Sequence, residues 1–408
     1  MSDIVPLVHQ IALAIEATHP SLKASSDFDK GMAISEYMLG RHESVAQLNA
    51  AVAADESLGH LRQGWLDRGP GGDGVIQNHM LPHVFVRDAL DGKAVEESLA
   101  SARSFAASEK SNVDTYFPVA GVDAVEAVPL KDGLTLVPWS QVPEGNGKRW
   151  FDDASNPARR TLGSSHFVTV RPTLAIRFTE RGRKVLFASR AEAYPNEQLR
   201  LTEFRDQWEL SADVMRCITA TAVCPSAILG SWADLDDGFA NRLGGSDYRY
   251  QANAMIDLRL ARPHHAIDPK IADLFQRYIA IGGEVRDVLR ISLDRLALAL
   301  RESMLTDRAI DLGIALETML LHNAGEADRG ELRYRAAIRG ATFLGGSSEE
   351  RLRTYNLLRD AYDLRSKAVH SGRIDPKDKI RKMVPAEILS NAAATCAAVA
   401  RALIEREE

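Results

Sequence analysis

The spacing of hydrophobic and polar positions divides the chain into three regions. In residues 1–112 the apolar positions have helical spacing and lie in Ala-rich stretches, which predicts a mainly helical amino-terminal region. The spacing shortens in residues 113–265, where an Asp-Gly turn separates two apolar runs in "VPLKDGLTLVPW". Leu174, Ile176 and Phe178 then alternate with other residues, as is typical of a strand. This second region is predicted to be a mixed or mostly β module.

Helical spacing returns in residues 266–408 and predicts an all-α bundle of about five helices. Ser347 and Glu350 form a capping-box pattern before one helix. Thr306 or Asp307 is expected to cap an earlier helix, and Pro385 fits the first turn of the last one. The predicted fold class is α+β and multidomain, with a helical first region, a mixed or β middle module and a helical bundle at the end.

Composition adds limits on location. The chain has 408 residues, of which 45% are hydrophobic and 26% are charged, as in ordinary soluble proteins. Asp3 stands where an export signal needs positive charge, and no apolar run approaches the roughly 20 residues of a membrane span. We therefore predict a cytoplasmic protein without a membrane partner. Cys217, Cys224 and Cys396 are an odd number without CxxC spacing, so we expect reduced core thiols.

Positive charge is concentrated near the carboxyl end. The whole chain has a formal net charge of −6, which argues against a protein that coats nucleic acid. Residues 329–382, however, hold 14 Lys and Arg against 7 Asp and Glu, a net charge of +7. A run of cations is usually a solvated surface, but this one surrounds the motif described next, which favours contact with nucleic acid.

The motif is the stretch "YDLRSKAVHSG", Tyr362 to Gly372, at the end of a predicted amphipathic helix. Arg365 falls on an apolar stripe of that helix, where a guanidinium is expected to face an interface, a carboxylate or an anion. His370 lies about 140° further around an ideal helix, so the two side chains cannot meet from one rigid helix. Either the helix ends before His370, as Gly372 suggests, or a second copy of the protein supplies the complementary residue.

Arginine and histidine together suit the cleavage of RNA by its own 2′-OH. That reaction needs a proton acceptor, a proton donor and positive charge near the developing phosphorane. Histidine can take either proton role at neutral pH, and arginine offers phosphate a bidentate fork. No metal or other cofactor is required. His79 and His83 have the spacing of a zinc helix, but Pro82 is expected to disrupt the helix and no Glu follows the first His, so we predict no metal site.

The longer run "LLRDAYDLRSKAVHSG", preceded by "ALETMLL" and "ELRYRAAIRGATFLG", resembles the HEPN superfamily and its Apea-like branch over about residues 285–408. The family's Arg-x4–6-His motif, with a polar residue after the Arg, matches Arg365, Ser366 and His370. The resemblance implies a helical bundle that forms a homodimer with two motifs around one cleft. It implies a metal-independent endoribonuclease that acts on RNA, often as a toxin or as an effector of antiviral defence against phage.

The resemblance also implies that the first two regions are a sensor or regulatory part, which would respond to a phage or cellular trigger. Some members of the family lack nuclease activity. A non-catalytic alternative therefore stays open, in which the bundle binds RNA or nucleotides or serves as a dimerisation scaffold.

Three residues are the catalytic candidates. His370 is expected to handle protons, Arg365 to stabilise the phosphorane and Ser366 to position phosphate, although a serine near a helix end often bonds its own backbone. Three further cations are the candidates for RNA binding: Lys367, Arg359 and Arg373.

Two residues are expected to support the site: Asp363 and Tyr362. Asp363 precedes His370 by seven residues and could orient its imidazole, or it could pair with Lys367. Glu317 interrupts the apolar face of an earlier helix, and its expected role is a hydrogen bond to Tyr or Arg inside the bundle.

Overall fold

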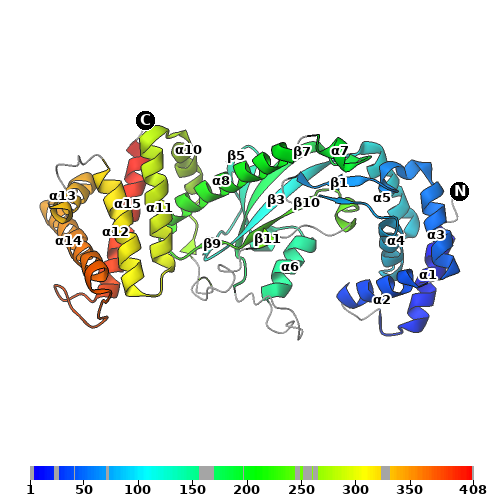
Figure 1. Cartoon of the computed structure of the whole chain (residues 1–408), viewed down its shortest axis with the longest axis horizontal. Coiled ribbons are helices and arrows are strands. Elements are labelled where there is room, and N and C mark those ends of the chain that lie inside the picture. The colour runs from blue at the N-terminus through cyan, green and yellow to red at the C-terminus, as the bar shows by residue number, and fades with distance from the viewer. Residues whose placement is uncertain are drawn as a thin grey trace.

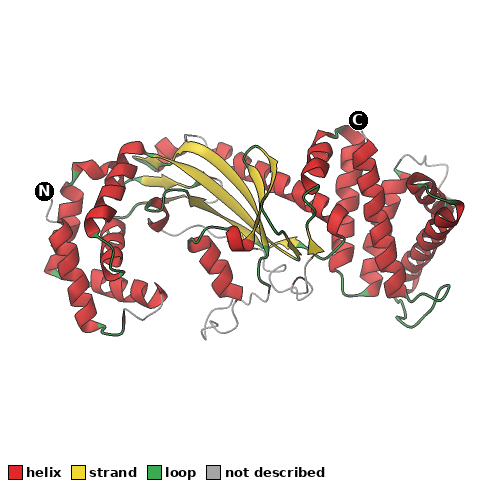
Figure 2. Ribbon diagram, turned by 180° about the vertical axis from the view of Figure 1, so that it is seen from behind, coloured by secondary structure: helices red, strands yellow, loops and turns green. Residues whose placement is uncertain are grey.

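The computed structural model shows an elongated molecule with helices at both ends and a sheet between them (Figures 1 and 2). The α+β class predicted from the sequence is confirmed. The structure describes the following residues: 4–22, 27–40, 42–69, 73–155, 170–195, 197–243, 249–250, 260, 265–322 and 331–406.

The amino-terminal end is helical, as predicted. Its helices are α1 (Ile4–Thr18), α2 (Asp27–Leu39), α3 (Glu43–Ala54), α4 (Met80–Leu90) and α5 (Val95–Ser108), with a 3-10 helix at Glu56–Leu61. They enclose a hydrophobic cluster that includes Ile11, Phe85 and Phe105, each with 0–1% of its surface exposed. A small antiparallel sheet closes this end, built from β1 (Trp65–Asp67), β2 (Asp73–Val75) and β8 (Leu186–Phe187).

The centre of the molecule is an antiparallel sheet with strand order β11-β10-β3-β7-β6-β5, and β9 pairs with β3. The strands are β3 (Lys110–Ala120), β5 (Val128–Lys131), β6 (Leu134–Pro138), β7 (Leu174–Lys184), β9 (Ala227–Ile228), β10 (Gly230–Leu235) and β11 (Arg249–Tyr250). The predicted Asp-Gly turn joins β5 and β6, and Gly133 adopts a left-handed φ of +70° that favours glycine. A short parallel pair joins β4 (Val122–Asp123) to β12 (His265–Ala266).

A helix covers each face of this sheet. On one face Phe117 contacts Phe204 and Trp208 of α8 (Glu197–Ala222), a 26-residue helix that was not predicted. On the other face α6 (Asn146–Ser155) packs Phe151 against Trp232, with ring centroids 5.4 Å apart. Figure 1 shows α8 running along the sheet toward the carboxyl-terminal helices. A four-residue helix, α7 (Arg190–Ala193), precedes it.

The carboxyl-terminal end is all helical. Its helices are α10 (Ile271–Ala280), α11 (Gly283–Arg301), α12 (Leu305–Leu321), α13 (Leu332–Leu344), α14 (Ser348–Ser371) and α15 (Pro385–Arg406). The capping box of Ser347 and Glu350 is present with both of its bonds, and Pro385 begins α15, as predicted. The predicted cap of α12 is wrong: Met304 holds the cap position, and Thr306 and Asp307 lie inside the first turn, where an acidic side chain complements the helix dipole.

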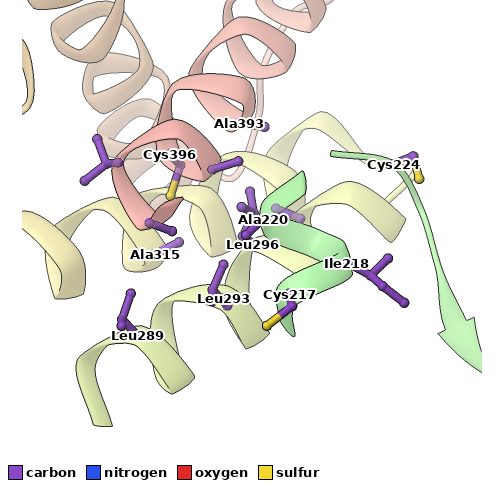
Figure 3. Packing of buried hydrophobic residues seen from close by; sticks show 14 of the residues in the cluster. Cys217, Ile218, Ala220, Cys224, Leu289, Leu293, Leu296, Ala315, Ala393 and Cys396 are labelled. Atoms are coloured by element: carbon purple, nitrogen blue, oxygen red, sulfur yellow. The ribbon is translucent and has the colours of Figure 1, made fainter. Parts of the chain in front are cut away.

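One continuous hydrophobic core joins the sheet to the bundle. Figure 3 shows Cys217 and Ala220 of α8 beside Leu293 and Leu296 of α11, and Cys396 of α15 belongs to the same cluster. The three cysteines are free and buried, as predicted, and burial raises the pKa of Cys396 to about 12. Ion pairs flank this contact, with Arg286 2.6 Å from Asp213 and Arg216 2.8 Å from Asp294. The end of α8 is thus fixed to the bundle.

By length and hydropathy, α15 is the one helix of the described residues that could cross a membrane. Half of its most apolar stretch is buried within the protein. Buried residues line it from Ile388 to Ile404, and it contacts α8 and α10 to α14. α15 therefore packs as the core helix of the bundle.

Candidate functional site

The motif helix runs without a break past His370. α14 extends from Ser348 to Ser371, and Gly372 ends it with a left-handed φ of 64°, donating its N–H to the Ala368 carbonyl at 3.0 Å. The possibility that the helix ends before His370 is therefore wrong, because Gly372 can take the left-handed conformation one residue after the helix. Arg365 and His370 point in directions about 140° apart, and within one chain they do not converge.

Arg365 lies against α12. Its Nη2 is 3.3 Å from Oε2 of Glu317, and the two side chains are 27% and 24% exposed. The expectation that Arg365 faces a carboxylate and that Glu317 bonds an arginine inside the bundle is confirmed. The guanidinium carbon lies 5.7 Å from the ring centroid of Tyr362, and burial, with the charge of Glu317 second, raises the pKa of Tyr362.

Gly313 makes room for the stem of Arg365. A Cβ atom on Gly313 would lie 2.4 Å from Cγ of Arg365, closer than any real contact. Gly313 is buried in the middle of α12, where glycine weakens a helix by roughly 0.5–1 kcal/mol relative to alanine. Gly313 was not predicted from the sequence, although an isolated glycine in a helical pattern often has a packing role.

His370 and Ser366 are the available polar side chains of the motif. His370 is exposed and Ser366 is half-buried, and neither side chain makes a hydrogen bond to the part of the chain that the structure describes. The serine that bonds the helix backbone is Ser371, whose hydroxyl donates to the Lys367 carbonyl at 2.7 Å. His370 can therefore accept or donate a proton without first breaking an interaction within the described residues.

The charged neighbours are paired differently from the expectation. Lys367 lies 2.6 Å from Asp378 in the loop after α14, and Asp363 lies 2.6 Å from Arg333 of α13. The expected pair of Lys367 with Asp363 is therefore wrong. Asp363 also does not orient His370, because its carboxylate is bonded to Arg333 and the two residues are two helical turns apart, about 10 Å along the axis.

The remaining RNA-binding candidates differ in exposure. Arg359 is half-buried, and its guanidinium carbon lies 5.7 Å from the Tyr355 ring centroid. Arg373 is exposed in the loop directly after α14. A buried carboxylate near the motif was not predicted from the sequence: Asp360 is 2% exposed and lies 3.5 Å from Nε of Arg381. Burial raises the pKa of Asp360.

Among the described residues, no group of three or more His, Cys, Asp and Glu side chains is arranged to hold a metal ion. Pro82 does not disrupt the helix as expected, because α4 begins at Met80 and accommodates proline in its first turn. His79 occupies the N-cap position of α4 without a side-chain cap bond, and the Nε2 of His83 lies 3.4 Å from the Ser35 hydroxyl.

A scan against protein-family models and searches of curated proteins and of solved structures find no match to this chain. The assignment of a function rests on the residues of the motif and their surroundings.

Proposed function

We propose that the carboxyl-terminal bundle is a metal-independent endoribonuclease of the HEPN type, which acts as a homodimer. The observation that carries the proposal is the placement of Arg365 and His370 on one unbroken helix. His370 is exposed in the last turn of α14, and Arg365 lies on the flank that faces α12. In a dimer, the second copy brings its His370 to a phosphate that contacts Arg365 of the first copy, which one chain cannot do alone.

In the proposed reaction, His370 of one copy accepts the proton of a ribose 2′-OH, and the 2′-oxygen attacks the adjacent phosphorus. The bond from phosphorus to the 5′-oxygen of the next nucleotide breaks. That oxygen takes a proton from water, and the protonated His370 returns its proton to the hydroxide that is left. The products are a 2′,3′-cyclic phosphate and a 5′-hydroxyl. Arg365 of the second copy stabilises the charge that develops on the phosphorane, and Ser366 donates a hydrogen bond to a phosphate oxygen.

Glu317 holds Arg365 in place without occupying all of its donors. A guanidinium has five N–H donors, and the hydrogen bond to Glu317 uses Nη2. The side chain is 27% exposed, so part of the fork remains accessible to a phosphate oxygen. Glu317 is proposed as a positioning residue, since its own contacts are with Arg365 and the neighbouring phenol of Tyr362.

Exposed apolar side chains on α13 and α14 support a contact with a second copy. They are Tyr334, Ile338, Leu352 and Val369, with exposed fractions of 50%, 42%, 58% and 51%. Val369 directly precedes His370 in the last turn of α14. Val369 therefore places an exposed apolar side chain beside the motif, where a contact with a second copy would cover it.

The amino-terminal helices and the sheet are proposed as the regulatory part that senses a phage or cellular trigger. Support comes from α8, which contacts both the sheet and the bundle. Near its start, Glu203 lies 3.3 Å from Arg183 of the sheet, and near its end, Asp213 bonds Arg286 of the bundle. The proposed location is the cytoplasm, where RNA is present and free thiols stay reduced.

The test is an RNA-cleavage assay in excess EDTA with the purified chain and its His370→Ala variant. Cleavage by the wild type that ends in a 2′,3′-cyclic phosphate, and that is lost in His370→Ala, is the expected result. His9, an exposed histidine on α1, supplies the matched control, because His9→Ala should cut as well as the wild type. Equal cleavage by His370→Ala, with both proteins folded by circular dichroism, would contradict the proposal.

One observation favours a second function, a non-catalytic RNA- or nucleotide-binding scaffold. Arg365 is already bonded to Glu317 within the chain, and His370 points away from it. A scaffold of this kind would bind RNA and leave it intact in the same assay, with and without EDTA. Retention of RNA without cleavage, across the dimer concentrations tested, would support this function in place of the nuclease.

A further inference from the structure

The loop between α14 and α15, residues 372–384, is here named the strap. It begins two residues after His370, at the end of α14, and extends from the bundle at the lower left of Figure 1. Its charged residues are Arg373, Asp375, Lys377, Asp378, Lys379, Arg381 and Lys382. Five cations and two acids leave a net charge of +3 in a protein whose net charge is −6.

Two ion pairs fasten the strap to α14. Asp378 lies 2.6 Å from Lys367, and Arg381 lies 3.5 Å from Asp360. Asp360 is 2% exposed, so the second attachment reaches into the side of the bundle. These pairs use one strap cation and one strap acid. The strap therefore keeps its excess of positive charge after these two ion pairs are formed.

A tight turn fixes the carboxyl-terminal end of the strap. Ile380 and Met383 each donate a backbone N–H to the carbonyl of the other, at 3.0 Å. Between them, Arg381 and Lys382 have φ of 49° and 76°, a left-handed conformation that favours glycine or asparagine. Two such side chains cost on the order of 1–3 kcal/mol each, and such strain persists where the surroundings impose it. Ile380 and Met383 pack against the bundle core and hold the turn.

Four strap cations remain available to a ligand. Arg373, Lys377, Lys379 and Lys382 are exposed and make no ion pair with the described residues. The start of the strap is also ordered, because the Ser371 hydroxyl donates to the Arg373 carbonyl at 3.1 Å. The apolar residues Ile374, Ile380 and Met383 face the bundle core and are not presented outward. A lipid surface is a poor partner for such a loop, since membrane-binding segments present apolar residues together with cations.

We propose that the strap docks the sugar-phosphate backbone of a single-stranded RNA and leads it to His370. Arg373, Lys377, Lys379 and Lys382 each bind phosphate oxygens on strand positions next to the one that is cut. The identification of the polyanion as RNA rests on the proposed function. The cations contact phosphates alone, so the strap binds DNA of the same sequence equally well. Lys367 is not in this set, because it is paired with Asp378.

The test measures fluorescence anisotropy of a fluorescein-labelled single-stranded oligouridylate, with the full chain carrying His370→Ala so that the probe stays intact. In that background, Lys379→Glu/Lys382→Glu should weaken binding by about tenfold or more at low salt. The slope of log Kd against log salt should fall by about 1.4, because each lost phosphate contact contributes roughly 0.7 on a single strand. The matched control, Lys110→Glu/Lys270→Glu, changes the charge equally at exposed sites away from the strap and should leave affinity within about twofold.

Lys382→Gly is a second strap variant, which distinguishes a loss of binding from a loss of folding. Glycine relieves the left-handed strain at residue 382, so this variant should be at least as stable as the parent, yet it should bind the probe more weakly. If both strap variants bind the RNA probe as tightly as the parent, the inference is wrong. It is also wrong if the strap variants keep their RNA affinity but lose binding to phosphatidylserine vesicles, because the strap would then bind membranes.

Cleavage by the same strap variants with His370 restored separates this inference from the nuclease proposal. If the wild type cuts RNA and the strap variants bind and cut equally well, the strap inference fails and the nuclease stands. If the wild type never cuts RNA but the strap variants lose affinity, the nuclease fails and the strap stands as a binding surface for single strands.

Discussion

A Cβ atom on Gly313 of α12 would lie 2.4 Å from Cγ of Arg365 on α14, so the missing side chain of Gly313 lets Arg365 lie across α12. Gly313→Ala should therefore lower the free energy of unfolding by about 1–3 kcal/mol, because the arginine stem must move. Urea unfolding measures the change. Gly31→Ala in α2 is the matched control: a Cβ there meets nothing within 4 Å, so it should stabilise the protein by up to about 1 kcal/mol. Equal stabilisation by both variants would refute the role of Gly313.

Glu317 and Arg365 should behave as a coupled pair. Glu317→Ala leaves a largely buried guanidinium without its carboxylate and should lower the free energy of unfolding by roughly 1–3 kcal/mol. Arg365→Met removes the cation and leaves Glu317 unpaired. In a double-mutant cycle the double variant should be less destabilised than the sum of the two single variants, by at least about 0.5 kcal/mol. Strict additivity would show that the contact contributes nothing.

The carboxylate of Asp88 should make the free energy of unfolding depend on pH. This buried carboxylate of α4 accepts hydrogen bonds from Ser98, Lys93 and Arg242. Burial opposes its ionisation, but the Ser98 bond and the two cations outweigh burial and lower its pKa. The ionised group therefore stabilises the protein fully above the pKa of the unfolded chain, about 3.9, and this contribution is lost as pH falls through the lower folded value.

The expected result for Asp88→Asn is a loss of about 2–4 kcal/mol at neutral pH, since Arg242 loses its partner. The difference from the wild type should narrow as the pH falls below about 3.9. Unfolding curves from neutral to acid pH measure it. Asp287→Asn removes an exposed carboxylate that lies 3.5 Å from Arg290 and should change stability by less than about 1 kcal/mol at any pH. A pH-independent loss in Asp88→Asn would contradict this assignment.

Features that depend on a few neighbouring residues could be predicted from the sequence. The Ser347 and Glu350 capping box, the start of α15 at Pro385 and the turn at Gly133 each depend on a few adjacent residues, and each is present. The contact of Arg365 with a carboxylate could also be predicted from the sequence, because an arginine on an apolar stripe needs a partner. In these cases the local chemistry allowed one arrangement.

The features that could not be predicted from the sequence depend on contacts between residues far apart in the chain. The pairing of Asp363 with Arg333, and of Lys367 with Asp378, is decided by how α13 and the strap pack on α14, which no spacing within α14 reveals. The helix α8 was missed, although Phe204, Trp208, Ser211 and Met215 have helical spacing, because the strands on either side of it favoured a β interpretation.

The most direct test of the central claim, that Arg365 and His370 from two copies form one site, mixes two inactive variants. Arg365→Ala and His370→Ala should each cut RNA far more slowly than the wild type. In a mixed dimer, the arginine of the His370→Ala chain meets the histidine of the Arg365→Ala chain, which rebuilds one of two sites. An equimolar mixture, allowed to exchange subunits, should recover about a quarter of wild-type cleavage, because half of the dimers are mixed. If the mixture stays as inactive as its components while exchange is confirmed by native mass spectrometry, the two residues do not act across a dimer and the account is wrong.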